Sequence, residues 1–107
     1  MIQTLSGFRA LLVFGEDSNL VLVNKQVQAL QKDPAGIKER DINIVLVKKE
    51  SNLYKKYKIE PGSFTIVLIG KDNTEKYRSD TVIAIAQLFS IIDAMPMRKA
   101  EIKKKGN

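Results

Sequence analysis

Three short apolar runs constrain the fold of this chain more than any other feature of its sequence. They span residues 9–14, 41–47 and 64–69, and the first, Arg-Ala-Leu-Leu-Val-Phe, shows no alternation between apolar and polar positions. Runs of this kind are typical of strands that are covered on both faces of a sheet. The sequence therefore predicts an α/β domain built around buried strands.

A helical pattern separates the first two runs. Its apolar stripe comprises Leu20, Val23, Val27 and Leu30, Gln26 lies off that stripe, and the stretch 33–36 (Asp-Pro-Ala-Gly) is expected to end the helix. Further along, we expect a short helix, a hairpin, a long helix and a restart of helix near the C-terminus. We expect the short helix over 52–57 and the two hairpin strands over 64–69 and 75–78. Ser79-Asp80 is expected to cap the long helix, Pro96 to end or kink it, and residues 97–105 to restart a helix.

This order of elements predicts the architecture. Parallel strands joined by a helix require a right-handed crossover, and the polar strand 75–78 suits a sheet edge. We expect a thioredoxin-like three-layer sandwich: a four-stranded mixed sheet in the order 2-1-3-4, with helices on both faces. The 107 residues are expected to form one domain, with a basic C-terminal segment over 97–107.

Several segments carry a resemblance to a known group. They are residues 9–14, 33–36, 40–41, 62–72 and 92–98, the last reading Ile-Asp-Ala-Met-Pro-Met-Arg. Together they resemble a bacterial thioredoxin-like domain family of unknown function, related to a domain in vertebrate sushi-repeat-containing matrix proteins. The resemblance implies a thioredoxin-like fold and no established activity. It favours export to the periplasm or cell envelope if the chain is a mature domain, and a cytoplasmic location otherwise.

The residue types that are missing exclude most catalytic chemistry. The sequence contains no cysteine and no histidine, so it offers no thiolate, no disulfide, no imidazole base and no Cys/His zinc site. On the thioredoxin pattern, the redox cysteines would fall near Asn19 and Leu22 and the cis-proline near Phe64, whereas Pro61 comes about three residues too early. We expect neither a dithiol mechanism nor a cofactor, metal or enzyme activity.

One candidate ligand or partner edge lies between the loops 15–19 and 60–64. Ligands of α/β sheets favour the carboxyl ends of strands, and a helix N-terminus suits an anion. The alternatives are that Asp17 or Ser18 only caps the helix, or that a hydroxyl or carboxylate here supports an enzyme. The residues expected at this edge are Asp17, Ser18, Asn19, Ser63 and Phe64.

Two basic segments form a second candidate surface. The net charge is +6, and basic segments attract polyanions, although they also serve as solvated surface. The candidates are Lys48, Lys49, Lys55, Lys56 and Lys58 in the first segment, and Arg98, Lys99, Lys103, Lys104 and Lys105 in the second.

Two smaller features have competing interpretations. Met95 and Met97 suit an adaptable protein contact, or they cover the sheet while Pro96 redirects the chain. Arg98 would then close on the sheet edge, on Asp93, or on an anionic partner. Asp72 and Asp80, with Glu75 nearby, suggest a carboxylate pair, but they are better interpreted as turn and cap residues.

These observations favour a non-catalytic binding or adaptor domain whose partner is another protein. The alternative is a module that binds a polyanion, either a sulfated glycan or a nucleic acid, through the two basic segments. No run of about 18 apolar residues is present, so we expect no membrane insertion. We expect a monomer or a weak dimer.

Overall fold

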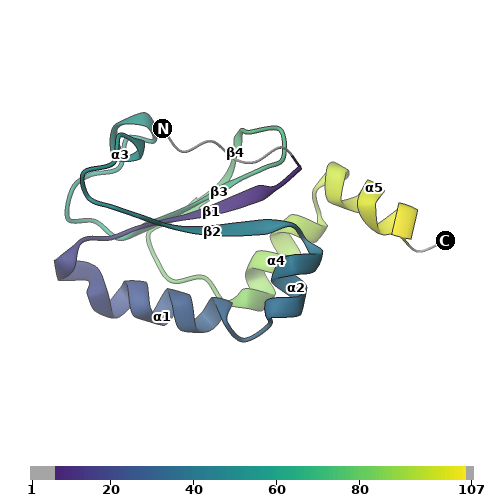
Figure 1. Ribbon diagram of the computed structural model, residues 1–107, viewed down its shortest axis with the longest axis horizontal. Helices are drawn as coiled ribbons and strands as arrows, with labels where there is room; N and C mark the ends of the chain where they lie inside the picture. Colours follow the sequence, from purple (N-terminus) through teal and green to yellow (C-terminus); the bar gives the residue numbers. More distant parts are fainter. Residues whose placement is uncertain (1–6, 106–107) are drawn as a thin grey trace.

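The computed structural model describes residues 7–105, which form a four-stranded mixed sheet (Figure 1). Strand β1 (Arg9–Phe14) lies between β2 (Ile42–Val47) and β3 (Thr65–Ile69), and β4 (Glu75–Ser79) completes the order β2-β1-β3-β4. β1 is parallel to β2 and antiparallel to β3, and β3 is antiparallel to β4. The predicted sheet and strand order are confirmed, and they are consistent with a thioredoxin-like arrangement.

Helices lie against both faces of the sheet, as predicted (Figure 1). One face is covered by α1 (Leu20–Leu30), α2 (Pro34–Glu39) and α4 (Ile85–Asp93), the short helix α3 (Leu53–Lys56) lies on the other, and the last helix, α5 (Pro96–Lys105), extends beyond the sheet at one end. A short 3₁₀ turn, η1 (Asp17–Asn19), precedes α1.

Strand β1 contributes to two cores because its side chains alternate between the faces. Leu11 and Val13 pack toward α1 and α4, whereas Leu12 and Phe14 pack toward α3. All six residues of β1 are buried. The apolar run of β1 lacks alternation because both faces of this central strand are covered, as the sequence predicted.

Strand β2 differs from the prediction. Its sequence suggested burial on both faces, but only its two terminal residues are buried, and Ile44 and Leu46 are 38% and 54% exposed. β2 lies at the edge of the sheet, where α1 and α2 leave these two side chains partly uncovered. The prediction of a fully buried second strand is wrong.

The first helical region also differs from the prediction. Gln26, which the pattern placed off the apolar stripe, is fully buried, whereas Leu20 on the stripe is 54% exposed. Residues 33–36 were expected to end the first helix, and they also form the start of a second one, α2. The Asp33 carboxylate accepts a hydrogen bond of 2.9 Å from the Gly36 N–H, and Pro34 occupies the first turn.

The C-terminal helices follow the prediction in part. Ser79 belongs to β4 and its hydroxyl contacts Thr81, so the expected cap at Ser79-Asp80 is wrong and α4 begins only at Ile85. Helix α4 ends at Asp93 and α5 starts at Pro96, as the proline suggested. No helix in the described part of the chain has the length and hydrophobicity needed to cross a membrane.

Candidate functional site

The two loops of the predicted ligand edge meet, and their polar groups bind one another. The Gly62 N–H donates a 2.8 Å hydrogen bond to the Glu16 carboxylate, and the Asn19 amide donates one of 3.2 Å to the Gly62 carbonyl. The Asn19 side-chain oxygen also accepts from the Glu16 N–H at 3.0 Å. Glu16 and Asn19, rather than Asp17 or Ser18, therefore order the turn before α1.

The other residues expected at this edge do not converge. Asp17 and Ser18 are exposed, and Ser63 is exposed at the rim of a separate polar hollow of about 490 Å³ that Arg78 also lines. Phe64 is only 4% exposed and belongs to the core beneath α1 and α4. Phe64 therefore cannot contact a ligand at this edge, because its ring is part of the packed interior.

The five lysines of the first basic segment are exposed. We call this set the α3 lysine patch, and none of its lysines forms an ion pair with another described residue. Helix α3 directs Leu53 and Tyr54 into the core, which leaves its lysines facing solvent, and Lys56 approaches the Tyr57 ring at 5.5 Å. The patch comprises Lys48, Lys49, Lys55, Lys56 and Lys58.

The second basic segment is a different kind of surface, because Arg98 is buried. Its guanidinium group is 1% exposed and contacts Glu39 at 2.5 Å, Asp93 at 3.1 Å and Glu101 at 3.5 Å. Arg98 therefore does not contribute to the basic surface that the sequence predicted. Of the contacts expected for Arg98, the one with Asp93 is present. Lys99, Lys103 and Lys104 are exposed on α5, and the Lys105 side chain lies outside the described residues.

The two basic segments do not form one patch. Helices α3 and α5 lie at opposite ends of the molecule (Figure 1). A polyanion bound at the α3 lysine patch would therefore not contact the lysines of α5 at the same point.

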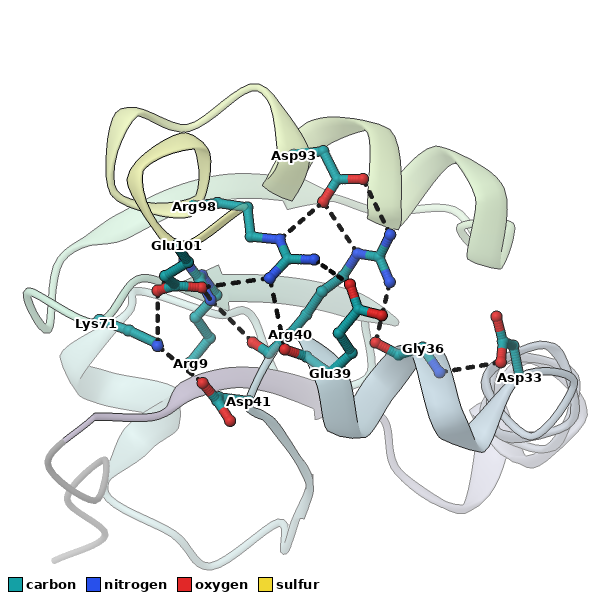
Figure 2. Close-up of polar contacts among 10 residues, drawn as sticks. All are labelled: Arg9, Asp33, Gly36, Glu39, Arg40, Asp41, Lys71, Asp93, Arg98 and Glu101. Carbon is teal, nitrogen blue, oxygen red and sulfur yellow. Dashed lines mark hydrogen bonds and ion pairs between the residues drawn. The ribbon is translucent and has the colours of Figure 1, made fainter. Parts of the chain in front are cut away.

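Arg98 belongs to a network that joins the two ends of the chain (Figure 2). Arg9, at the start of β1 and 1% exposed, contacts Glu101 at 3.2 Å, and Lys71 contacts the same carboxylate at 2.7 Å. Arg40, on the far side of Arg98, donates two hydrogen bonds to the Asp93 carboxylate, from Nε to Oδ1 and from Nη2 to Oδ2. We call this set the arginine network, and it comprises the cations Arg9, Arg40, Lys71 and Arg98 with the anions Glu39, Asp41, Asp93 and Glu101.

The network lowers the pKa of two of its carboxylates, Asp93 and Glu101. Hydrogen bonds from Arg40, supported by Arg98, hold the pKa of Asp93 below its ordinary value despite partial burial. Burial raises the pKa of Glu101, but hydrogen bonds from Lys71 and Arg9 outweigh that effect, so its pKa is also lowered. The charges balance inside the fold, and the network is suited to holding α5 in place rather than to proton transfer.

Of the remaining candidates, Asp72 and Met95 have structural roles. Asp72 accepts hydrogen bonds from Thr74 and Lys76 in the β3–β4 turn, which lowers its pKa to about 2, led by the Lys76 contact. Met95 packs on the core, but Met97 is 48% exposed, so the interpretation that both methionines cover the sheet is wrong for Met97. Within residues 7–105, no group of three or more acidic side chains is arranged to hold a metal ion.

An apolar hollow lies beside strand β2, where the sequence suggested no site. This groove has a volume of about 670 Å³ and lies between the outer strand β2 and helices α1 and α2. Its floor includes the two exposed side chains of β2, Ile44 and Leu46. We call it the β2 groove, and the lining residues used below are Val27, Leu30, Pro34, Ile37, Ile44 and Leu46.

Comparison with known families gives a classification for most of the chain. Residues 4–101 match the family described as "Domain of unknown function (DUF4174)". The chain belongs to this family. The family's description assigns no activity, and no curated protein matches the chain.

A solved structure supports the fold of the DUF4174 domain. The chain is similar to a protein described as "Structure of a malarial protein", with a TM-score of 0.58 and 20% sequence identity. The similarity covers 81% of this chain and 96% of the malarial protein. At this identity the likeness concerns the fold alone, and the function of the DUF4174 domain has to be argued from its surface.

Proposed function

We propose that this DUF4174 domain is a non-catalytic thioredoxin-like domain without redox activity, which associates with another protein through the β2 groove. We also propose that the chain is related to bacterial thioredoxin-like domains and to the domain in vertebrate sushi-repeat-containing matrix proteins, as the resemblance implies. The chain has no thiol or imidazole, and Glu16, Asn19 and Gly62 satisfy one another at the edge where thioredoxins carry their cysteines. Neither redox chemistry nor a ligand pocket is supported at that edge.

The exposure of Ile44 and Leu46 on an outer strand carries the proposal. Outer strands present unpaired backbone groups, and proteins usually protect them with charges, proline or a covering segment. Strand β4 at the opposite edge has such protection, because Glu75, Lys76 and Arg78 are charged and exposed. β2 has no charged residue and no proline over its six positions. An apolar groove along an unprotected edge is the form that strand addition uses in protein recognition.

Site-specific crosslinking tests the proposed association surface. A photoreactive benzophenone side chain is placed at Leu46 in one full-length variant, and at Ile102, which is 43% exposed on α5, in the control. We expect the Leu46 variant to crosslink to one defined protein segment, whereas the Ile102 variant should give no defined adduct. Equal crosslinking from both positions, or no adduct from Leu46, would overturn the proposal.

A second candidate function, the binding of a polyanion, rests on the α3 lysine patch. Its five lysines are exposed and form no ion pair within the described part of the chain, so their charge is available to a partner. Binding to heparin fragments or a short DNA duplex would weaken with salt by about one log unit per log unit of salt for each charge neutralised.

Amide chemical-shift titration tests the polyanion candidate at low and physiological salt. Lys55→Gln with Lys56→Gln should weaken binding and reduce its salt dependence, whereas the paired control Lys32→Gln with Lys38→Gln should change it less. Shifts that spread over the whole surface, or that disappear at physiological salt, would count against this function.

A further inference from the structure

Within residues 7–105, the outer side of strand β2 has a defined set of backbone groups that no other strand pairs with. The Arg9 N–H donates a 2.7 Å hydrogen bond to the Asp41 carbonyl, and Arg9 is registered with Ile42 in the parallel pair. Successive peptide groups of a strand point to opposite sides. The N–H and C=O groups of Ile42, Ile44 and Leu46 therefore face away from β1, whereas those of Val45 face β1.

The same alternate residues carry the side chains of the β2 groove. Ile44 and Leu46 are exposed beside α1 and α2, while Ile42 is buried at the inner end of the strand. A strand that paired with β2 would thus satisfy its outward backbone groups and cover these two side chains in one step. Such a strand needs apolar residues at alternate positions, because its inner side chains would lie in the groove.

Strand β2 is itself a strand of this kind, and we propose that its partner is β2 of a second copy of this chain. The two copies would pair antiparallel about a two-fold axis and join their four-stranded sheets into one continuous sheet. This inference rests on the proposed function, since it identifies the protein that occupies the β2 groove.

Backbone geometry restricts the register of this pairing. In an antiparallel ladder, two residues that exchange both hydrogen bonds must each direct their peptide groups outward. With the axis at Val45, Ile44 lies opposite Leu46 of the second copy, and both face outward. With the axis at Ile44, Ile42 lies opposite Leu46 of the second copy, which the backbone also allows. An axis between Ile44 and Val45 would place an outward residue opposite an inward one.

Charge complementarity selects the register centred on Val45. That register places Lys49, two residues after the end of one strand, opposite Asp41, which directly precedes the other strand and also contacts Lys71 at 2.9 Å. The register centred on Ile44 instead places Lys48 opposite Arg40, and like charges directly opposite are unfavourable. The two ends of β2 are thus complementary when a second copy pairs antiparallel about Val45.

The size of the contact sets the expected affinity. One strand and one shallow groove form an interface at the low end of specific protein contacts, so we expect a dissociation constant on the order of 10–100 µM. Sedimentation equilibrium of the full chain measures it, at loading concentrations from about 5 to about 500 µM. The expected result is an average mass that rises from one copy toward two.

A pair of matched variants tests the surface. Ile44→Lys places a charge on the proposed interface, and Ile102→Lys makes the same substitution on α5, where the side chain has a similar exposure of 43% against 38%. We expect Ile44→Lys to remain monomeric and Ile102→Lys to dimerise like the unmodified chain. Lys49→Glu should weaken the dimer by about three- to tenfold, because it replaces an attraction to Asp41 with repulsion.

Hydrogen exchange keeps the test decisive if Ile44→Lys fails to fold. In the unmodified chain, the Ile44 and Leu46 amides should exchange more slowly as concentration rises, while the Val45 amide should not change. A chain that stays monomeric, or equal dimerisation of the two lysine variants, would overturn the second copy as partner. If Leu46 nevertheless crosslinks to a different protein, the proposed function stands and only its occupant changes. No adduct and no dimer would overturn both.

Discussion

The side-chain amide of Gln26 satisfies both backbone hydrogen-bonding groups of Ile83. Its nitrogen donates to the Ile83 carbonyl and its oxygen accepts from the Ile83 N–H, each at 2.9 Å. Gln26 is fully buried and Ile83 is 2% exposed, so no solvent competes for these bonds. The pair attaches α1 to the segment between β4 and α4, although 57 positions separate the two residues along the chain.

Replacing Gln26 should destabilise the fold markedly. Gln26→Leu keeps most of the side-chain volume but leaves the Ile83 N–H and C=O buried without partners, at about 1–3 kcal/mol for each unsatisfied group. Partial relaxation and added apolar burial reduce the sum, so we expect a loss of about 2–4 kcal/mol. Urea unfolding measures it, and Gln28→Leu on the exposed side of α1 should change the free energy of unfolding by less than about 0.5 kcal/mol. Equal effects of the two substitutions would contradict this role.

Loss of Arg98 should release α5 from the body of the domain. Arg98→Met preserves much of the volume, but it removes the cation that Glu39, Asp93 and Glu101 share. Because these carboxylates are partly exposed and can be hydrated, we expect a cost of about 2–4 kcal/mol, at or below the usual range for a broken buried pair. Chemical unfolding and proteolysis of α5 report the change. Lys99→Met, one residue away and exposed, is the control, and similar behaviour of both variants would argue against the network.

The arginine network should also make stability depend on pH. The pKa values of Asp93 and Glu101 are lower in the fold than their ordinary values of 3.8 and 4.5. Their ionised forms therefore stabilise the fold above about pH 4.5, and that contribution is lost as pH falls through the lowered values. The free energy of unfolding of the unmodified chain should fall between pH 5 and pH 2 (a range spanning these ordinary pKa values). The fall should be shallower in Arg98→Met and unchanged in Lys99→Met; parallel curves for all three chains would refute the linkage.

The strands and their order could be predicted because their signals are local. Each central strand is a short apolar run bounded by turn residues, and a polar strand such as 75–78 suits an edge. The order then follows from the crossover rule and the hairpin. The same local reasoning placed the break between α4 and α5 at Pro96.

The functional surfaces were harder to predict because they depend on contacts between distant residues. Gln26 is polar, so only its partner Ile83 explains its burial. Arg98 resembles its lysine-rich neighbours in sequence, yet Glu39 and Asp93 make it an interior residue. Ile44 and Leu46 read as buried, and their exposure follows from the outer position of β2. The predicted strand order contained that signal, since it already placed this apolar strand at an edge.

Gly36 offers a prediction whose sign is opposite to that expected from helix propensity. Within a helix, Gly→Ala ordinarily stabilises by up to about 1 kcal/mol. A Cβ atom on Gly36, however, would lie 2.5 Å from the Phe89 ring and 2.6 Å from the Asp33 carboxylate. The ring cannot easily retreat, because the Arg40 guanidinium lies over it at 3.8 Å.

Gly36→Ala should therefore destabilise the domain by about 1–3 kcal/mol, the usual cost of overpacking. Urea unfolding of a double-mutant cycle isolates the cause. In a chain that carries Phe89→Leu, the smaller side chain makes room for the new methyl group, so Gly36→Ala should become neutral or stabilising. If Gly36→Ala stabilises the unmodified chain, or costs the same in both backgrounds, the close approach of α2 and α4 at this point does not limit the packing.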